Sequence, residues 1–285
     1  MTTSIRKEAT TISNTVDRQV INNVNHYHIR RIHRLRLQDV RERTGLYYIE
    51  GLRFVSQAIA RGVSIETLVV SRPLLKHPYA QRLIHQQQRI GTLVLEVTPA
   101  VLHSLSLVDD PQGIGAVVRQ RWEPLQHIKV GEELCWIAHQ FVRLPGNLGS
   151  ILRTSEAVGG AGVILLDDTT DPYDPAVVRA TMGAIFAQRF VRTNVAEFAR
   201  WKQQHECMLV GTSPQATQDY HSTVYRRPTI LLMGEERKGL TADLQALCDT
   251  MVRIPMVGQS DSLNLAIATS LLLYEVFNQR RMQVI

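Results

Sequence analysis

The sequence is poor in cysteine and has no long apolar run. Its three cysteines, Cys135, Cys207 and Cys248, lie far apart and form no CxxC pair. The sequence therefore predicts neither a disulfide framework nor a zinc site. No apolar stretch approaches the roughly 18 residues needed to cross a bilayer. The first twenty residues lack the apolar core of a secretory signal. We therefore expect a cytoplasmic protein that binds neither a metal nor a membrane.

A GxGxxG loop after a first strand is also absent, which argues against a Rossmann-type methyltransferase or dehydrogenase. The composition is otherwise that of a soluble globular protein, with 44% hydrophobic and 20% charged residues. A chain of 285 residues is long enough for two domains with separate cores.

Positive charge is concentrated near the N-terminus. Residues 1–61 hold eleven Arg or Lys against five Asp or Glu, an excess of six that equals the net charge of +6 for the whole chain. The spacing over residues 26–43 predicts one helix with Arg30, Arg34 and Arg41 on one side and apolar residues on another. Because arginine forks suit phosphate, this side is a candidate RNA-contacting face. The alternative is a solvated charged helix without a partner.

The order of the expected elements divides the chain into two α/β domains. Residues 1–27 are polar and are expected to form a flexible extension. Helical and strand-like patterns alternate over residues 28–121, and the weakly periodic residues 122–131 are the expected linker. The alternation restarts over residues 132–285, where apolar strands and helical segments predict a parallel sheet covered on both faces.

Three segments of the second domain combine glycine or proline with small polar residues just after an apolar strand. They are residues 144–160, 231–240 and 254–270. Ligands of parallel sheets bind at the carboxyl ends of the strands, and glycine lets the backbone approach a ligand closely. Each segment alone could be a turn or a helix cap. All three together in one domain indicate a shared pocket.

The same segments resemble the motifs of the SpoU (TrmH-like) branch of the SPOUT RNA 2′-O-ribose methyltransferases. The family's motifs are an Asn followed six residues later by an Arg, then Gly-x-Glu-x-x-Gly-Leu, then Ile-Pro-Met followed by Ser-Leu-Asn. The matching residues are Asn147 and Arg153; Gly234, Glu236, Gly239 and Leu240; and Ile254, Pro255, Met256, Ser262, Leu263 and Asn264. The family's Arg-Ala-Ser-x-Gly-Ala stands here as RATMGA from Arg179, with Thr181 in place of Ser.

This resemblance implies transfer of a methyl group from S-adenosylmethionine to a ribose 2′-hydroxyl of RNA, without a metal. The implied catalytic residues are Arg153, Asn147, Glu236 and Asn264. The implied cofactor-binding residues are Thr212, Gly234, Ile254, Met256 and Leu263. The candidate RNA-binding residues are Arg179, Arg30, Arg34 and Arg53. Because a guanidinium does not lose its proton in proteins, we expect Arg153 to stabilise the ribose alkoxide electrostatically, with the proton leaving to an RNA phosphate or water.

The resemblance also implies a deep trefoil knot near the C-terminus and a homodimer whose sites lie near the interface, where arginines can be shared. The first domain resembles, more weakly, the ribosomal-protein-like RNA-binding domain of many members, which favours ribosomal over transfer RNA. The alternatives are a tRNA 2′-O-methyltransferase, an enzyme of this fold that methylates a base, and an RNA-binding protein of this fold without catalysis.

Overall fold

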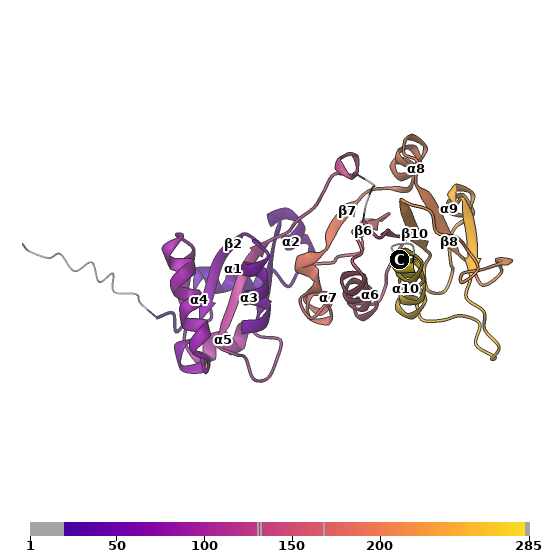
Figure 1. Cartoon of the computed structure of the whole chain (residues 1–285). Coiled ribbons are helices and arrows are strands. Elements are labelled where there is room, and N and C mark those ends of the chain that lie inside the picture. The colour runs from indigo at the N-terminus through magenta and orange to yellow at the C-terminus, as the bar shows by residue number, and fades with distance from the viewer. Residues whose placement is uncertain (1–19, 130, 132, 168, 283–285) are drawn as a thin grey trace, which may run out of the picture.

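The computed structural model describes residues 20–129, 131, 133–167 and 169–282, which form two α/β domains side by side (Figure 1). The expected extension over residues 1–27 lies mostly outside the described residues. From Val20 onward the chain contacts the first domain, because Ile21 forms a parallel bridge with Val97. The backbone N–H of Ile21 donates to the carbonyl of Glu96 at 2.8 Å.

The N-terminal domain is a four-stranded sheet in the order β1-β4-β2-β3, in which only β2 and β3 are parallel. Helices α1, α2 and α5 cover one face of the sheet, and α3 and α4 cover the other. The elements are α1 (Tyr27–Arg34), α2 (Gln38–Thr44), β1 (Leu46–Glu50), α3 (Leu52–Ala60), β2 (Ile65–Val70), η1 (Arg72–Leu74), α4 (Pro78–Arg89), β3 (Leu93–Glu96), α5 (Pro99–Leu105) and β4 (Ile114–Arg119).

The prediction of one helix across the basic segment is wrong, and so is the exposed position that it gave Arg41. The chain turns between α1 and α2, and the side chain of Arg41 folds back over this turn. Its Nη1 donates to the carbonyls of Leu35 and Arg36 at 2.9 and 2.8 Å. Its Nε and Nη2 donate to Asp171 Oδ2 at 2.9 and 2.7 Å. Arg41 is therefore buried and joins the two domains, so it is not available to a phosphate.

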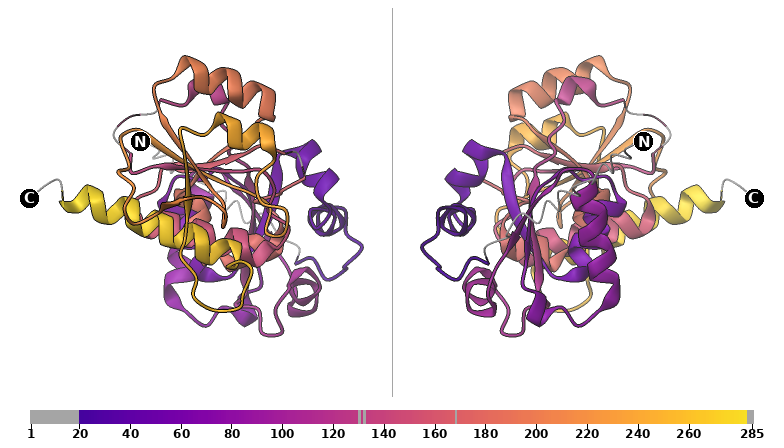
Figure 2. Two further views of the ribbon diagram at one scale, coloured as in Figure 1. Left: turned by 90° about the vertical axis from the view of Figure 1, so that its right-hand side faces the viewer. Right: turned by 90° about the vertical axis from the view of Figure 1, so that its left-hand side faces the viewer.

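The C-terminal domain is built on a seven-stranded sheet, parallel throughout, in the order β7-β6-β5-β10-β8-β11-β9. Helices α6, α7 and α10 cover one face, and α8, α9 and η2 cover the other (Figure 2), as the sequence predicted. The elements are η2 (Leu125–His127), β5 (Trp136–His139), α6 (Pro145–Val158), β6 (Gly162–Leu165), α7 (Pro175–Ala180), η3 (Ala184–Ala187), β7 (Arg189–Arg192), α8 (Val195–Gln204), β8 (Met208–Thr212), β9 (Gln218–Asp219), β10 (Thr229–Met233), α9 (Ala242–Leu247), β11 (Thr250–Arg253) and α10 (Leu265–Met282).

Residues 174–188 have a helical pattern in the sequence, but the structure interrupts the helix there. Helix α7 ends at Ala180, and Met182 and Gly183 have φ values of 52° and 100°. Such backbone angles suit glycine and cannot continue a right-handed helix. The RATMGA segment is therefore a turn between α7 and the short helix η3.

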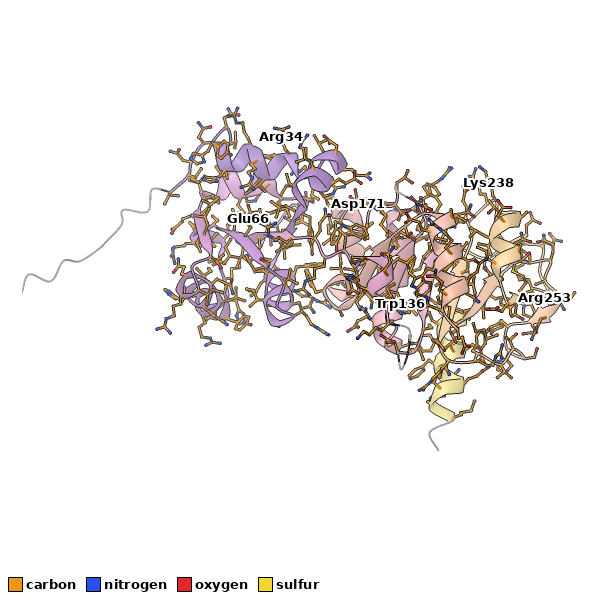
Figure 3. The ribbon with its side chains drawn as sticks, turned by 90° about the horizontal axis from the view of Figure 1, so that it is seen from above. Arg34, Glu66, Trp136, Asp171, Lys238 and Arg253 are labelled. Carbon is orange, nitrogen blue, oxygen red and sulfur yellow. The ribbon has the colours of Figure 1, made fainter. Side chains whose placement is uncertain are left out.

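The two domains share a continuous hydrophobic core and several polar contacts. Figure 3 shows Asp171 at their junction, where its carboxylate receives the buried guanidinium of Arg41. Nearby, the Tyr173 hydroxyl donates to the carbonyl of Arg121 at 2.7 Å. In the expected linker, Leu125 and Ile128 are buried against the C-terminal domain. The relative orientation of the two domains is therefore fixed by the shared core, by these polar contacts and by the buried linker residues.

No helix within the described ranges is both long and apolar enough to span a bilayer.

Candidate active site

A cavity of about 500 Å³ opens at the carboxyl ends of three neighbouring strands. Its walls are the segments that follow β8, β10 and β11, including the stretch that leads from β11 into α10. Backbone groups at such strand ends are free of sheet pairing and can bind a ligand. The volume falls within the range of about 300–1,000 Å³ of small-molecule sites. We call this cavity the strand-end pocket.

All five predicted cofactor-binding residues line the strand-end pocket, namely Thr212, Gly234, Ile254, Met256 and Leu263. Ile254 and Leu263 are half-buried and Met256 is exposed, so their apolar atoms remain available to a ligand. Polar groups of the pocket come from backbone and from side chains such as Thr212, Ser213 and Gln245. An apolar pocket with a few polar groups suits an adenosine with an aliphatic tail.

The loop from Gly234 to Leu240 forms a tight turn on one side of the pocket. Glu235 and Gly239 exchange two backbone hydrogen bonds, of 3.1 and 2.8 Å. Gly239 has a φ of 67°, in the left-handed region that favours glycine. A Cβ at Gly234 would overlap the backbone of Gly239 and Leu240, so only glycine lets the loop close in this form. The glycine is thus required by the loop itself, and the loop in turn shapes the pocket.

Three of the predicted catalytic residues form one hydrogen-bonded cluster, which joins the three sequence motifs. Asn264 Nδ2 donates to Asn147 Oδ1 at 3.0 Å and to Glu236 Oε1 at 3.1 Å. Asn147 Nδ2 donates to Glu236 Oε2 at 3.4 Å. Asn264 Oδ1 also accepts the backbone N–H of Ala266 at 2.9 Å, at the start of α10. Because each oxygen of Glu236 accepts from an amide nitrogen, Glu236 fixes the orientation of both amides.

Arg153, the fourth predicted catalytic residue, does not line the strand-end pocket. It lies on α6, six residues after Asn147, or about 9 Å further along the helix axis. Its exposed side chain instead lines a second cavity of about 410 Å³, between α6 and α3 of the N-terminal domain. Asn147 therefore bonds to Asn264 and Glu236, not to Arg153. Within one chain the predicted catalytic arginine and the predicted cofactor pocket are separate.

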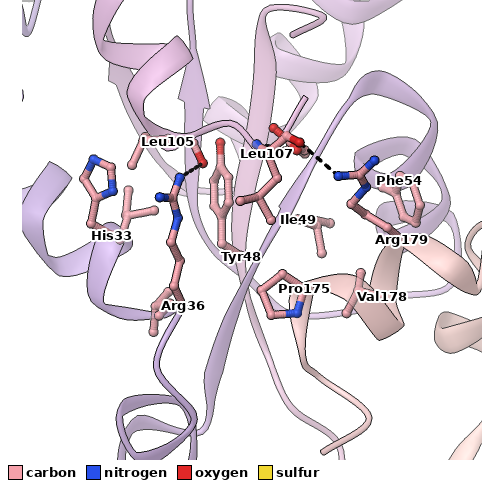
Figure 4. Close-up of a pocket in the computed structure, with 13 residues that line it drawn as sticks. His33, Arg36, Tyr48, Ile49, Phe54, Leu105, Leu107, Pro175, Val178 and Arg179 are labelled. Atoms are coloured by element: carbon pink, nitrogen blue, oxygen red, sulfur yellow. Dashed lines mark hydrogen bonds between the residues drawn. The ribbon is translucent and has the colours of Figure 1, made fainter. Parts of the chain in front are cut away.

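The predicted RNA-binding arginines lie at several places on the molecule. Arg30 and Arg34 are exposed on α1, and Arg53 is exposed on α3, where it lines the same cavity as Arg153. Arg179 Nη1 donates to the carbonyl of Leu107 at 2.9 Å (Figure 4). The pocket that these residues line has a volume of about 30 Å³, room for one or two water molecules, so it is too small for a cofactor. Arg179 thus helps to hold the domain junction.

His139, at the carboxyl end of β5, is fully buried, and neither ring nitrogen has a hydrogen-bond partner within the described ranges. Burial lowers the pKa of this imidazole to about 4, while the charge of Asp167 acts in the opposite direction. The ring is therefore neutral at pH 7, at the end of the strand next to β10.

Sequence reasoning missed Arg61, Arg237 and Lys238. Arg61 lines the cavity that contains Arg153, and it follows Arg53 by eight residues, at the C-terminal end of the same helix. That spacing, close to two helical turns, was a readable signal. Arg237 and Lys238 line the strand-end pocket, within the second motif. In the part of the chain that the structure describes, no group of three or more His, Cys, Asp or Glu side chains is placed to bind a metal.

Comparison with known families agrees with this geometry. Residues 136–274 match the SpoU rRNA Methylase family, and residues 26–116 match the MRM3-like substrate binding domain. The first match contains the three motifs, and the second covers most of the N-terminal domain.

Individual relatives are similar over most of the chain. The 23S rRNA (uridine(2479)-2′-O)-methyltransferase of Streptomyces viridochromogenes is 32% identical, covering 84% of this chain and 85% of the relative. The structure of an AdoMet-bound rRNA methyltransferase from Sinorhizobium meliloti has a TM-score of 0.85 and 35% identity, covering 93% of this chain and 98% of that one. The structure of AviRb from S. viridochromogenes with AdoMet has a TM-score of 0.82 and 30% identity, covering 90% and 98%.

Proposed function

The chain belongs to the SpoU rRNA methylase family, and from that premise we propose that it methylates a ribose 2′-hydroxyl of ribosomal RNA with S-adenosylmethionine. The observation that carries the proposal is the cluster of Asn147, Glu236 and Asn264. It joins the family's three motifs beside a pocket of suitable size and lining.

We assign cofactor binding to the strand-end pocket, through Thr212, Gly234, Ile254, Met256 and Leu263. When bound there, S-adenosylmethionine supplies a sulfonium-activated methyl group. The loops after β8, β10 and β11 orient it through backbone groups, and the apolar side chains exclude water. The hydrogen-bonded cluster fixes these loops relative to α6 and α10, through Asn147, Glu236 and Asn264. In this proposal their catalytic contribution is to hold the pocket in its reactive shape.

Arg153 has the charge that the reaction needs. A ribose hydroxyl is a weak acid, and a fixed guanidinium stabilises the alkoxide that forms as its proton leaves to an RNA phosphate or water. Since Arg153 lies outside the pocket of its own chain, we propose that a homodimer completes each site, with Arg153 of the partner subunit facing the ribose. Helix α10 offers an interface, because Ile267, Leu271 and Tyr274 lie on one side of it and are 54%, 36% and 48% exposed.

The proposed substrate follows from the N-terminal domain. Its match to a substrate binding domain and the rRNA-specific names of the relatives favour ribosomal over transfer RNA. We assign residues 28–121 to RNA binding, 122–131 to the linker and 132–285 to methyl transfer, with Arg30, Arg34, Arg53 and Arg179 in the RNA-contacting set. A trefoil knot around the strand-end pocket and a cytoplasmic location, where ribosomal RNA is available, complete the proposal.

The experiment that tests this function uses the full chain, S-adenosylmethionine with a labelled methyl group, and separate samples of unmodified 23S rRNA and bulk tRNA. We expect label in the 23S rRNA and none above background in the tRNA. Label in tRNA alone would replace the proposed substrate by the tRNA alternative. Binding of 23S rRNA with no label in either RNA would favour an RNA-binding protein without catalysis.

A further inference from the structure

The second cavity, about 410 Å³, lies between the two domains and has walls from both. Helix α3 contributes Arg53, Gln57 and Arg61, and α6 contributes Arg153 and Glu156. The turn at residues 181–184 forms the remaining wall. We call this cavity the arginine cleft. Neither of the two domains forms it alone.

The charge of the arginine cleft is positive. Three guanidinium groups meet one carboxylate, that of Glu156, which pairs with Arg61 at 3.5 Å. The side chains of Arg53 and Arg153 make no hydrogen bond or ion pair with any residue that the structure describes. Both are exposed. Their donors are therefore available to an anion without the loss of an existing contact.

The turn on the third side brings the backbone of one domain against a side chain of the other. Gly183 has a φ of 100°, which favours glycine, and an added Cβ would meet the end of the Gln57 side chain. The Oε1 atom of Gln57 is buried and has no hydrogen-bond partner within the described ranges. Met182, with a φ of 52°, extends an apolar side chain that is 41% exposed into the same cleft. The cleft thus offers cationic, polar and apolar surface within one small volume.

We propose that the arginine cleft binds a nucleotide of the target RNA strand next to the one that is methylated. Arg53 and Arg61 bind its phosphodiester, and Met182 contacts its sugar or base. Arginine forks match phosphate oxygens, and phosphate contacts position a nucleic acid without reading its sequence. Arg153, which we assign to the methylated ribose, lines the same cleft, so one strand passing through it reaches both groups. This inference rests on the proposed function.

The test compares Arg53→Glu with Arg89→Glu. Arg89 is an exposed arginine at the end of α4, which packs beside β3 at the sheet edge opposite the domain junction. The probe is protein-free 23S rRNA, titrated from 50 to 200 mM KCl. For Arg53→Glu we expect affinity to fall about tenfold or more, and the slope of log affinity against log salt to fall by about one. Arg89→Glu should stay near the wild type, and Arg53→Lys should keep most of the salt slope because it keeps the charge.

Calorimetry with S-adenosylmethionine shows whether each variant keeps its cofactor pocket, since Arg53 does not line it. Equal RNA affinity and equal salt slope for Arg53→Glu and Arg89→Glu, with methylation by the wild type intact, would remove the arginine cleft as an RNA site and leave the proposed function standing. Absence of methylation by the wild type would instead overturn the proposed function itself.

Discussion

At the scale of single residues, the site depends on one carboxyl group and two amides that orient one another. Glu236 accepts hydrogen bonds from Asn147 and from Asn264. Of the four predicted catalytic residues, the structure brings Asn147, Glu236 and Asn264 together and places Arg153 apart from them. The hydrogen bonds of the cluster could not be predicted from the sequence. Asn147 and Asn264 are 117 positions apart, and their contact depends on how the chain returns through the sheet.

Arg153→Ala should lower methyl transfer by about 100-fold or more, because the developing alkoxide loses its nearest fixed positive charge. Affinity for S-adenosylmethionine should not change, since Arg153 lies outside the strand-end pocket. Single-turnover transfer and calorimetry measure the two effects separately. Arg200→Ala, on the exposed side of α8, is the control and should transfer at the wild-type rate. Near-normal transfer by Arg153→Ala would contradict its assigned role.

His139 should make the protein less stable in acid. Its pKa is 6.5 when unfolded and about 4 in the fold, so between these values the unfolded chain binds a proton that the folded chain does not. The titration of His139 does not change the free energy of unfolding above pH 6.5. That free energy falls as the pH drops from 6.5 toward 4, by about 3 kcal/mol in total. His139→Leu removes this dependence. Urea unfolding of both proteins from pH 7 to 4 should show the wild type losing about 3 kcal/mol more than His139→Leu, and parallel curves would contradict the account.

At the scale of elements, strands β5, β6, β8, β10 and β11 of the C-terminal domain were predictable because each is a short, mostly apolar run. Strands β7 and β9 were missed, since β7 begins and ends with arginine and β9 has only two residues. The break between α1 and α2 in the basic segment, residues 26–43, was not predictable. A helical pattern does not show that the chain turns at Leu35, which is buried. The interruption at Met182 and Gly183 was also missed. The apolar spacing over residues 174–188 is helical, but it does not show that Met182 and Gly183 adopt positive φ values, which end the helical path.

Gly234→Ala should weaken binding of S-adenosylmethionine at least tenfold, because the new methyl group displaces the turn at Gly239 and Leu240 and so changes the pocket wall. The matched control is Gly258→Ala. Gly258 is exposed, has no atom within 4 Å of an added Cβ, and lies in the segment between β11 and α10. Calorimetry should give the control the wild-type affinity. Equal affinities for the two variants would mean that the cofactor is bound elsewhere.

At the scale of the whole molecule, one feature joins the two domains and another offers a surface for a second chain. The buried pair of Arg41 and Asp171 holds the N-terminal domain against the domain that carries the strand-end pocket. Helix α10 leaves apolar side chains uncovered on its outer side, where the left view of Figure 2 shows it running across the front of the molecule. Neither feature was readable from composition, since each depends on which side of a helix faces which neighbour.

Ile267→Asp should convert the proposed dimer into monomers, because it places a charge in the centre of the apolar side of α10. Sedimentation velocity measures the change, and methyl transfer should fall with it. Ile90→Asp makes the same chemical change at an isoleucine that is 71% exposed after α4, and it should leave the dimer intact. A wild type that sediments as a monomer and still transfers methyl groups would show that one chain completes its own site.

The most direct measurement for the whole account is the position of the transferred methyl group within the RNA. Ribosomal RNA labelled by the protein is hydrolysed with alkali, which cleaves every linkage except one that follows a 2′-O-methylated ribose. We predict that all label appears in a dinucleotide resistant to alkali. Label in mononucleotides would place the methyl group on a base and contradict the account.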